Sequence, residues 1–189
     1  MIIAETAQIG KNVDIGNDVH IGHFTVIHDN VTIMDKVVIG SHAIIKPHTV
    51  LGQGVFFDDY CVSSGHCQIG DFSQIRYQSI IARNVFIGRH VFFCAGVKTA
   101  YLNHMAKPNP KQLIVNDRVF VGDNSTILSG LTVSYGVVIG AHSLLTKDAI
   151  HTDGIYVGTP AKFTREMNMD EKAIRSDRMT TYVMRKEGV

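Results

Sequence analysis

The histidine at position 104 is a candidate for proton transfer, although it could also be an ordinary solvated loop residue. His104 and Asn103 lie in the segment TAYLNHMAKPNPKQLI, which contains two prolines and lacks the regular spacing found on either side of it. The pKa of histidine is ordinarily about 6.5, so at neutral pH its imidazole can accept a proton from a hydroxyl group. We therefore expect a loop that carries a general base, in which Asn103 either orients the imidazole or favours a turn.

A second histidine, His66, is a candidate for the same role. It lies in the run Ser64-Gly-His-Cys-Gln-Ile-Gly-Asp-Phe-Ser, and it also occupies a repeat position that other histidines share, which favours a plain corner residue. His48 precedes it by 18 residues, so the two side chains should stack in one column. Two ligands are too few for a zinc site, and we expect no bound metal.

A six-residue repeat from Ile3 to Lys98 must position these side chains. Each six-residue unit begins at Ile3 or at a sixth residue after it, and this first place is Ile or Leu in 13 of 16 units. The fifth place of each unit, such as Ala7, is small or β-branched. Glycine is common at the second place and Asn, Asp or His at the fourth, which suits tight corners and left-handed backbone angles. This period fits a short strand plus a corner, so three units should form one 18-residue coil of a stacked parallel prism.

The repeat stops after Lys98 and resumes at Val115, which predicts a loop leaving the prism at about residues 99–114. Pro160 should end the last coil. Asn168, with Glu171 three residues later, resembles a capping box and predicts a C-terminal helix packed on the prism or on a neighbour. Its apolar stripe would consist of Met169, Ala173, Ile174, Met179, Tyr182 and Val183. We expect one repeat domain over residues 1–165 and a helical tail over 166–189.

Units such as Ile9-Gly-Lys-Asn-Val-Asp resemble the hexapeptide repeat of left-handed parallel β-helix proteins. The resemblance implies an all-β, left-handed parallel β-helix of seven to eight triangular coils, with one protruding loop and a short C-terminal α-helix. The run from Asn116 to Gly130 and the later segments LTKD and VGTPAK resemble the C-terminal half of the hexapeptide acetyltransferases. The resemblance is greatest to the galactoside, maltose and nodulation-factor O-acetyltransferases.

That resemblance implies an acetyl-CoA-dependent O-acetyltransferase acting on a sugar or surface-polysaccharide precursor, with His104 as general base. It also implies a homotrimer with active sites between neighbouring prisms. The residues that would bind the acetyl-CoA donor are Ser125, Gly130, Ser143, Thr146, Lys147, Lys162 and Arg165. Met105 stands where the family commonly has proline, and Phe120 where it commonly has tryptophan, and these departures leave the acceptor open.

Two other functions fit the sequence. The Ser64–Ser73 run resembles part of the sialic-acid and bacillosamine-pathway N-acetyltransferases, so the acceptor could be a nucleotide-linked amino sugar, with His66 or His104 as base. A metal-dependent or non-catalytic β-helix trimer is the third alternative.

Composition limits the partners and the compartment. The net charge of +1 over 189 residues gives no basic stripe for nucleic acid. No apolar run is long enough to span a membrane, and the N-terminal residues lack the pattern of a signal peptide. Three cysteines without metal-ligand spacing favour packed thiols in a reducing cytoplasm, where we expect this protein.

Overall fold

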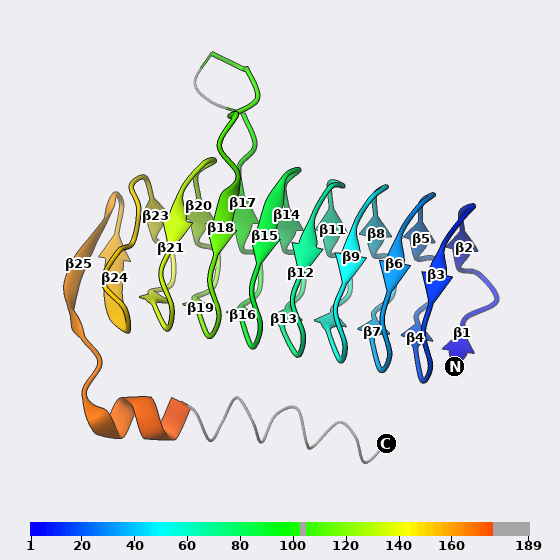
Figure 1. Cartoon of the computed structure of the whole chain (residues 1–189), viewed down its shortest axis with the longest axis horizontal. Helices are drawn as coiled ribbons and strands as arrows, with labels where there is room; N and C mark the ends of the chain where they lie inside the picture. Colours follow the sequence, from blue (N-terminus) through cyan, green and yellow to red (C-terminus); the bar gives the residue numbers. More distant parts are fainter. Residues whose placement is uncertain (103–104, 176–189) are drawn as a thin grey trace.

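The protein is a triangular prism of stacked coils, seen from the side in the computed structural model of Figure 1. The structure describes residues 1–102 and 105–175. Within these residues, the strands fall into three sheets, and nearly all neighbouring strands are parallel and one coil apart in sequence. The predicted left-handed parallel β-helix of about eight coils is confirmed.

We name the sheets A, B and C. Sheet A contains β1 (Ile2–Ile3), β4 (His20–Ile21), β7 (Val38–Ile39), β10 (Phe56–Phe57), β13 (Gln74–Ile75), β16 (Phe92–Phe93), β19 (Phe120–Val121), β22 (Val138–Ile139), β24 (Gly154–Gly158) and β25 (Ala161–Glu166). Sheet B contains β2 (Gln8–Ile9), β5 (Val26–Ile27), β8 (Ile44–Ile45), β11 (Val62–Ser63), β14 (Ile80–Ile81), β17 (Lys98–Thr99), β20 (Thr126–Ile127) and β23 (Leu144–Leu145). Sheet C contains β3 (Asp14–Ile15), β6 (Thr32–Ile33), β9 (Val50–Leu51), β12 (Gln68–Ile69), β15 (Val85–Ile87), β18 (Leu113–Val115) and β21 (Thr132–Val133).

The core follows the repeat. First-place residues such as Ile39 and Phe57 pair across one coil and point inward, where they are at most 2% exposed. The fifth-place thiols of Cys61 and Cys67 are buried among them, as the spacing predicts. Burial of this continuous aliphatic column supplies the main stabilisation of the prism, at about 25 cal/mol per Å² of apolar surface.

The corners depend on two different residue types. The fourth-place residues have left-handed backbone angles, among them Asn12 (φ 53°), His48 (58°) and His66 (51°), as predicted. The second-place glycines were also expected to have left-handed backbone angles, and this prediction was wrong, because residues such as Gly40 do not have a positive φ. They are required for close approach, since a Cβ on Gly40 would lie 2.3 Å from Asp59 Oδ1 in the next coil.

The predicted loop leaves the prism between β17 and β18 and projects from one edge in Figure 1. The repeat runs one place further than predicted, because Thr99 is 7% exposed and pairs with Ile127. Ile87 pairs with Val115, which is 28 residues later in sequence instead of 18. The interruption is therefore a ten-residue insertion into one coil.

The C-terminal end of the prism is closed by an antiparallel hairpin of β24 and β25. The prediction that Pro160 simply ends the last coil was incomplete, because the chain turns at the cis Thr159–Pro160 peptide and returns along β24. This antiparallel strand occupies the edge of sheet A where another parallel strand would pair.

Residues 169–175 are helical, which confirms the start of the predicted C-terminal helix. The capping box forms as predicted: Asn168 N–H donates to Glu171 Oε2 at 2.9 Å, and Glu171 N–H donates to Asn168 Oδ1 at 2.9 Å. The apolar stripe does not pack on the prism over this stretch, since Met169 is 79% and Ile174 57% exposed.

Polar side chains hold this helix against the prism instead. Arg175 Nη1 donates to Gly136 O at 2.6 Å, and Lys172 Nζ lies 2.9 Å from Asp153 Oδ2. Three members of the predicted stripe lie outside the described residues, namely Met179, Tyr182 and Val183.

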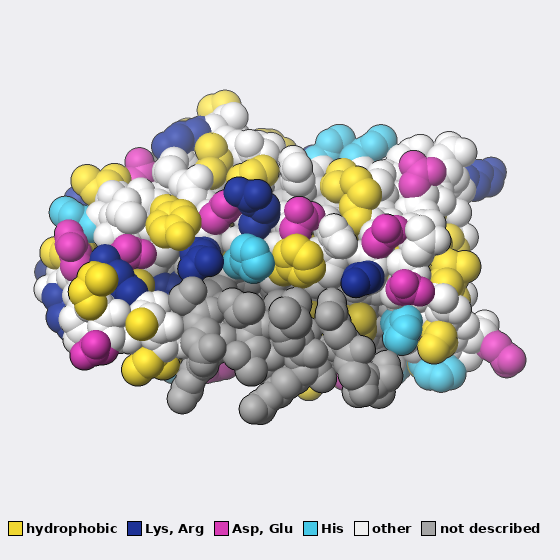
Figure 2. Space-filling view, turned by 60° about the horizontal axis from the view of Figure 1, so that its bottom comes forward, with side chains coloured by type: hydrophobic (Ala, Val, Ile, Leu, Met, Phe, Trp, Pro, Cys, Tyr) yellow, Lys and Arg dark blue, Asp and Glu magenta, His cyan; other side chains and the backbone are white. Residues whose placement is uncertain are grey.

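Acidic and basic side chains are interspersed over the face shown in Figure 2, in keeping with a net charge near zero. Among the described residues, no helix has the length and apolar character needed to cross a membrane.

Candidate functional site

The base of the inserted loop is anchored at the corner between sheets B and C by Tyr101, Asn109 and Lys111, which we call the loop foot. Asn109 N–H donates to Tyr101 O at 3.1 Å, and Asn109 Nδ2 donates to Ser129 O at the same distance. Lys111 Nζ lies 3.6 Å from Asp148 Oδ2. The loop is thus anchored to the following coils. Asn103 and His104 lie outside the described residues, and their catalytic role stays a prediction.

His66 lies on the same corner, between β11 and β12, two coils before the loop. Its exposed ring stacks on that of His48, with the ring centroids 4.7 Å apart, as the 18-residue spacing predicts. Desolvation, the Arg83 guanidinium and His48 lower the pKa of His66 below 6.5. The imidazole is therefore neutral at pH 7 and able to accept a proton.

Two of the predicted donor-binding residues, Ser125 and Ser143, lie inside the prism. They are 0% and 2% exposed, and they occupy the inward fifth place of their units. Ser125 Oγ donates to Gly140 O at 2.8 Å and accepts from Ser143 N–H at 3.1 Å, while Ser143 Oγ accepts from Gly158 N–H at 3.0 Å. Both hydroxyls thus tie neighbouring coils together, and any part they have in donor binding stays a prediction.

Gly130 is a corner residue with φ 72°, and Asn109 of the loop foot lies directly over it. A Cβ on Gly130 would lie 2.4 Å from Asn109 Nδ2. Thr146 is half-buried and directly follows β23. The structure therefore brings Gly130 to the loop foot and places Thr146 on the last coil of sheet B.

The three predicted phosphate-binding cations differ in their partners. Arg165 forms a two-bond ion pair with Glu171, with both N–O distances 2.7 Å, and this pair lowers the pKa of Glu171 to about 2. Lys147 and Lys162 are exposed and have no ion pair among the described residues. These two lysines are the cations that remain available to an anionic donor.

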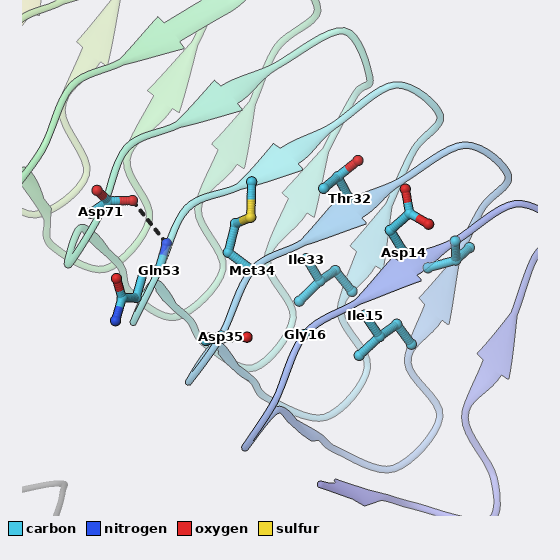
Figure 3. Close-up of a pocket in the computed structure, with 10 residues that line it drawn as sticks. Asp14, Ile15, Gly16, Thr32, Ile33, Met34, Asp35, Gln53 and Asp71 are labelled. Atoms are coloured by element: carbon cyan, nitrogen blue, oxygen red, sulfur yellow. Dashed lines mark hydrogen bonds between the residues drawn. The ribbon is translucent and has the colours of Figure 1, made fainter.

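A separate hollow of about 570 Å³ lies over the first coils (Figure 3). Asp14, Asp35 and Asp71 line it together with Met34, and Asp71 Oδ1 accepts a hydrogen bond of 2.9 Å from the N–H of Gln53. None of the predicted site residues lines it, and its three carboxylates would repel a phosphorylated ligand.

A metal centre is not built by the described part of the chain, where no group of three or more His, Cys, Asp or Glu side chains could hold an ion. Arg83 is a basic residue that was not among the predicted site residues, and it lies between His66 and the loop foot. The available signal was its third-place position in the repeat, where several other units have aspartate.

Comparisons with known proteins find a family model and relatives that match parts of this chain. Residues 18–53 match the family model described as bacterial transferase hexapeptide (six repeats). A galactoside O-acetyltransferase of Lactococcus lactis is 26% identical over 121 residues, covering 60% of this chain and 58% of the relative. A putative lipopolysaccharide biosynthesis O-acetyl transferase of Escherichia coli, WbbJ, is 29% identical over 138 residues, covering 64% and 65%.

Solved structures show the same fold at lower sequence identity. LpxA from Acinetobacter baumannii superposes with a TM-score of 0.65 and 20% identity, covering all of this chain and 78% of the other. AntD, an N-acyltransferase from Bacillus cereus, superposes with a TM-score of 0.55 and 17% identity, covering 92% and 91%. The chain has the left-handed parallel β-helix fold, part of it matches the hexapeptide-repeat model, and the predicted resemblance to the sugar O-acetyltransferases is confirmed. The chain spans less than two thirds of the length of the galactoside O-acetyltransferase and of WbbJ.

Proposed function

We propose that the protein is an acyltransferase that moves an acetyl group from acetyl-CoA to a hydroxyl group of a sugar or surface-polysaccharide precursor. The proposed base, His104, removes the acceptor hydroxyl proton while the oxygen attacks the thioester carbonyl. The C–S bond then breaks, and the CoA sulfur leaves with the proton from the imidazolium. Asn103 is proposed to orient His104.

The observation that carries the proposal is the ten-residue insertion between β17 and β18. The prism is otherwise a regular scaffold, and this insertion carries the proposed base at a corner where the foot is held by Asn109. Irregular excursions from a rigid scaffold commonly carry function. The names of the two O-acetyltransferase relatives support the same reaction class.

The proposed donor site lies on the coils that follow the loop. Lys147 and Lys162 remain available for the phosphates of CoA, while Arg165 is held by Glu171. The AntD structure contains coenzyme A and dTDP-4-amino-4,6-dideoxyglucose, which supports a CoA donor on this fold. We place the reaction in the cytoplasm, and we propose a homotrimer because exposed apolar side chains such as Phe24 and Tyr77 need cover.

The test is CoA release from acetyl-CoA in the presence of a panel of free sugars, sugar phosphates and nucleotide sugars. Release that depends on both acetyl-CoA and an acceptor supports the proposal, and mass spectrometry of the product distinguishes an ester from an amide. A panel that yields no acceptor-dependent release, with protein that is correctly folded by circular dichroism, overturns it.

The second candidate is N-acetylation of a nucleotide-linked amino sugar with His66 as base. The observation that favours it is the exposed, neutral imidazole of His66 on the corner that also carries the loop. An amide product, together with full loss of activity in His66→Asn, would identify this reaction.

A further inference from the structure

The corner between sheets B and C bears a cluster of basic side chains without carboxylate partners. His48, His66 and Arg83 lie in three successive coils, and Arg83 also borders the loop foot beside Tyr101 and Asn109. Arg83 and the two histidines have no ion pair with any described residue. The positive charge of Arg83 is thus not neutralised by an ion pair among the described residues, although the chain as a whole is nearly neutral.

The repeat explains why no third-place carboxylate accompanies His48, His66 and Arg83. At other corners a third-place aspartate accepts a backbone N–H of the preceding coil, as Asp71 does from Gln53 and Asp117 from Arg89. On the B–C corner this series begins with Asp29, which accepts from Lys11 N–H at 2.7 Å. The later third places are Pro47, Gly65 and Arg83, so the series of acids ends and a cation follows.

Because Arg83 stands where other corners have aspartate, the backbone N–H of Gly65 lacks a carboxylate acceptor in the next coil. Among the described residues, the N–H of Gly65 donates to Ser63 Oγ at 3.5 Å, which is a weak hydrogen bond. Lys46 is adjacent, because a Cβ on Gly65 would lie 3.4 Å from its Cβ. Lys46 has no ion pair among the described residues either.

We propose that His48, His66 and Arg83 form a binding site for a phosphate or pyrophosphate group. Arginine presents paired N–H donors that match phosphate oxygens, and the two imidazoles add N–H donors from a stacked column. The groups that act electrostatically on His66 are Arg83 and His48, both of them basic, so an anion here relieves repulsion instead of displacing an existing partner.

The site has a suitable relation to the loop. Two coils separate His66 from the loop, and coils are about 4.8 Å apart, so the separation along the prism is about 10 Å. A phosphorylated sugar held at this corner would span that distance. The anion site does not depend on the acyl-transfer proposal, because phosphate binding is measured without turnover.

The test is titration of the purified full-length protein with inorganic pyrophosphate, followed by NMR of the histidine ring carbons and protons. Binding should shift the His48 and His66 signals and raise the pKa of His66 by about one unit, because a bound anion favours the imidazolium. Arg83→Gln should weaken binding roughly tenfold or more. The matched control is Arg89→Gln, since Arg89 is paired with Asp117 on another corner and should leave binding unchanged.

Substitution His66→Asn gives a second variant that keeps the fold, because the same corner column already has Asn30 and Asn84 at positive φ. It should also weaken binding. The same titration is repeated with uridine diphosphate and with a sugar 1-phosphate. Tighter binding of either compound than of pyrophosphate shows that the bound phosphate belongs to that larger ligand. Unmoved His66 signals at millimolar pyrophosphate, or equal weakening by Arg83→Gln and Arg89→Gln, overturns the proposal.

Discussion

The carboxylate of Asp59 accepts a hydrogen bond of 2.6 Å from the backbone N–H of Ser41 in the preceding coil, and it fills the space beside Gly40. A side chain on Gly40 would lie 2.3 Å from Asp59 Oδ1 and 2.5 Å from Asp59 N. The hydrogen bond of Asp59 and the lack of a side chain on Gly40 therefore act together to allow close contact between two coils at this corner.

The first prediction concerns this contact. Gly40→Ala should lower the free energy of unfolding by about 2–3 kcal/mol, because the added methyl group meets backbone that cannot move without displacing the next coil. Urea unfolding measured by circular dichroism checks it. Met34→Ala is the control, since Met34 occupies the same place of its unit and is 46% exposed, and it should change stability by about 0.5 kcal/mol or less.

Excision of the insertion is the second prediction. Deletion of residues 102–111 restores 18-residue spacing from Ile87 to Val115 and leaves Gln112 at the fourth place, where Gln78 already has φ 59°. The shortened protein should keep its β-sheet circular dichroism spectrum and unfold cooperatively, yet release no CoA from acetyl-CoA. A folded protein with unchanged activity would show that the loop has no catalytic role.

The third prediction separates the two candidate bases. If His104 is the general base, His104→Ala should lower kcat by a factor of about 10²–10⁴, whereas His66→Asn should leave the chemical step within a few-fold of the original. His142→Asn is the control, because His142 is a fourth-place residue with φ 55° on a different corner. Steady-state kinetics with the best acceptor of the panel decide between them, and full activity in His104→Ala contradicts the assignment.

The fourth prediction concerns the donor. Replacing both Lys147 and Lys162 with glutamine should raise the KM for acetyl-CoA roughly tenfold, because two charge-assisted contacts to the CoA phosphates are removed. Lys11→Gln is the control, as Lys11 is an exposed lysine on the first coils. The KM for acetyl-pantetheine, which lacks these phosphates, should not change in the double variant. An equal effect on both donors would exclude the proposed phosphate contacts.

The fifth prediction is a pH dependence of stability. Burial raises the pKa of the Cys61 thiol to about 12, while in the unfolded chain a thiol titrates at about 8.5. Cys61 therefore contributes stability that is complete below about pH 8.5 and is lost as the pH rises toward about 12, because only the unfolded chain ionises in that window.

The measurement compares urea unfolding at about pH 8 and about pH 10.5. Between these values the original protein should lose about 2–3 kcal/mol more than the Cys61→Ala variant, which has no thiol at this position. The Cys67 thiol, whose pKa is also raised, remains in both proteins and cancels in the comparison. Identical losses in the two proteins would show that Cys61 ionises equally in both states.

The features that the sequence predicted correctly are those written in local spacing. Ile39 and Cys61 are buried because the six-residue period itself assigns them inward positions, and Asn168 and Glu171 cap a helix through groups three residues apart. The loop was visible because it breaks that period between Thr99 and Val115, whereas its length of ten inserted residues follows from the pairing of Ile87 with Val115.

The features that were missed depend on neighbours a full coil away. The space beside Gly40 is filled by Asp59, and Arg83 follows a proline and a glycine in its column, where aspartate at the same place could have supplied a carboxylate partner. Ser125 and Ser143, which the resemblance assigns to donor binding, occupy the fifth place of their units, and both are buried there. Their part in donor binding stays a prediction.

The different ends of the prism determine how this scaffold can be re-engineered. β25 runs antiparallel along β24 and occupies that edge of sheet A, whereas β1, β2 and β3 are the end strands of their sheets among the described residues and pair in parallel with β4, β5 and β6. In a stacked repeat each coil contacts only its neighbours. Whole coils of 18 residues should therefore be removable or addable before β4 without changing the corner that carries the loop. The length of the prism and the position of the loop can thus be varied independently when longer or shorter variants are designed.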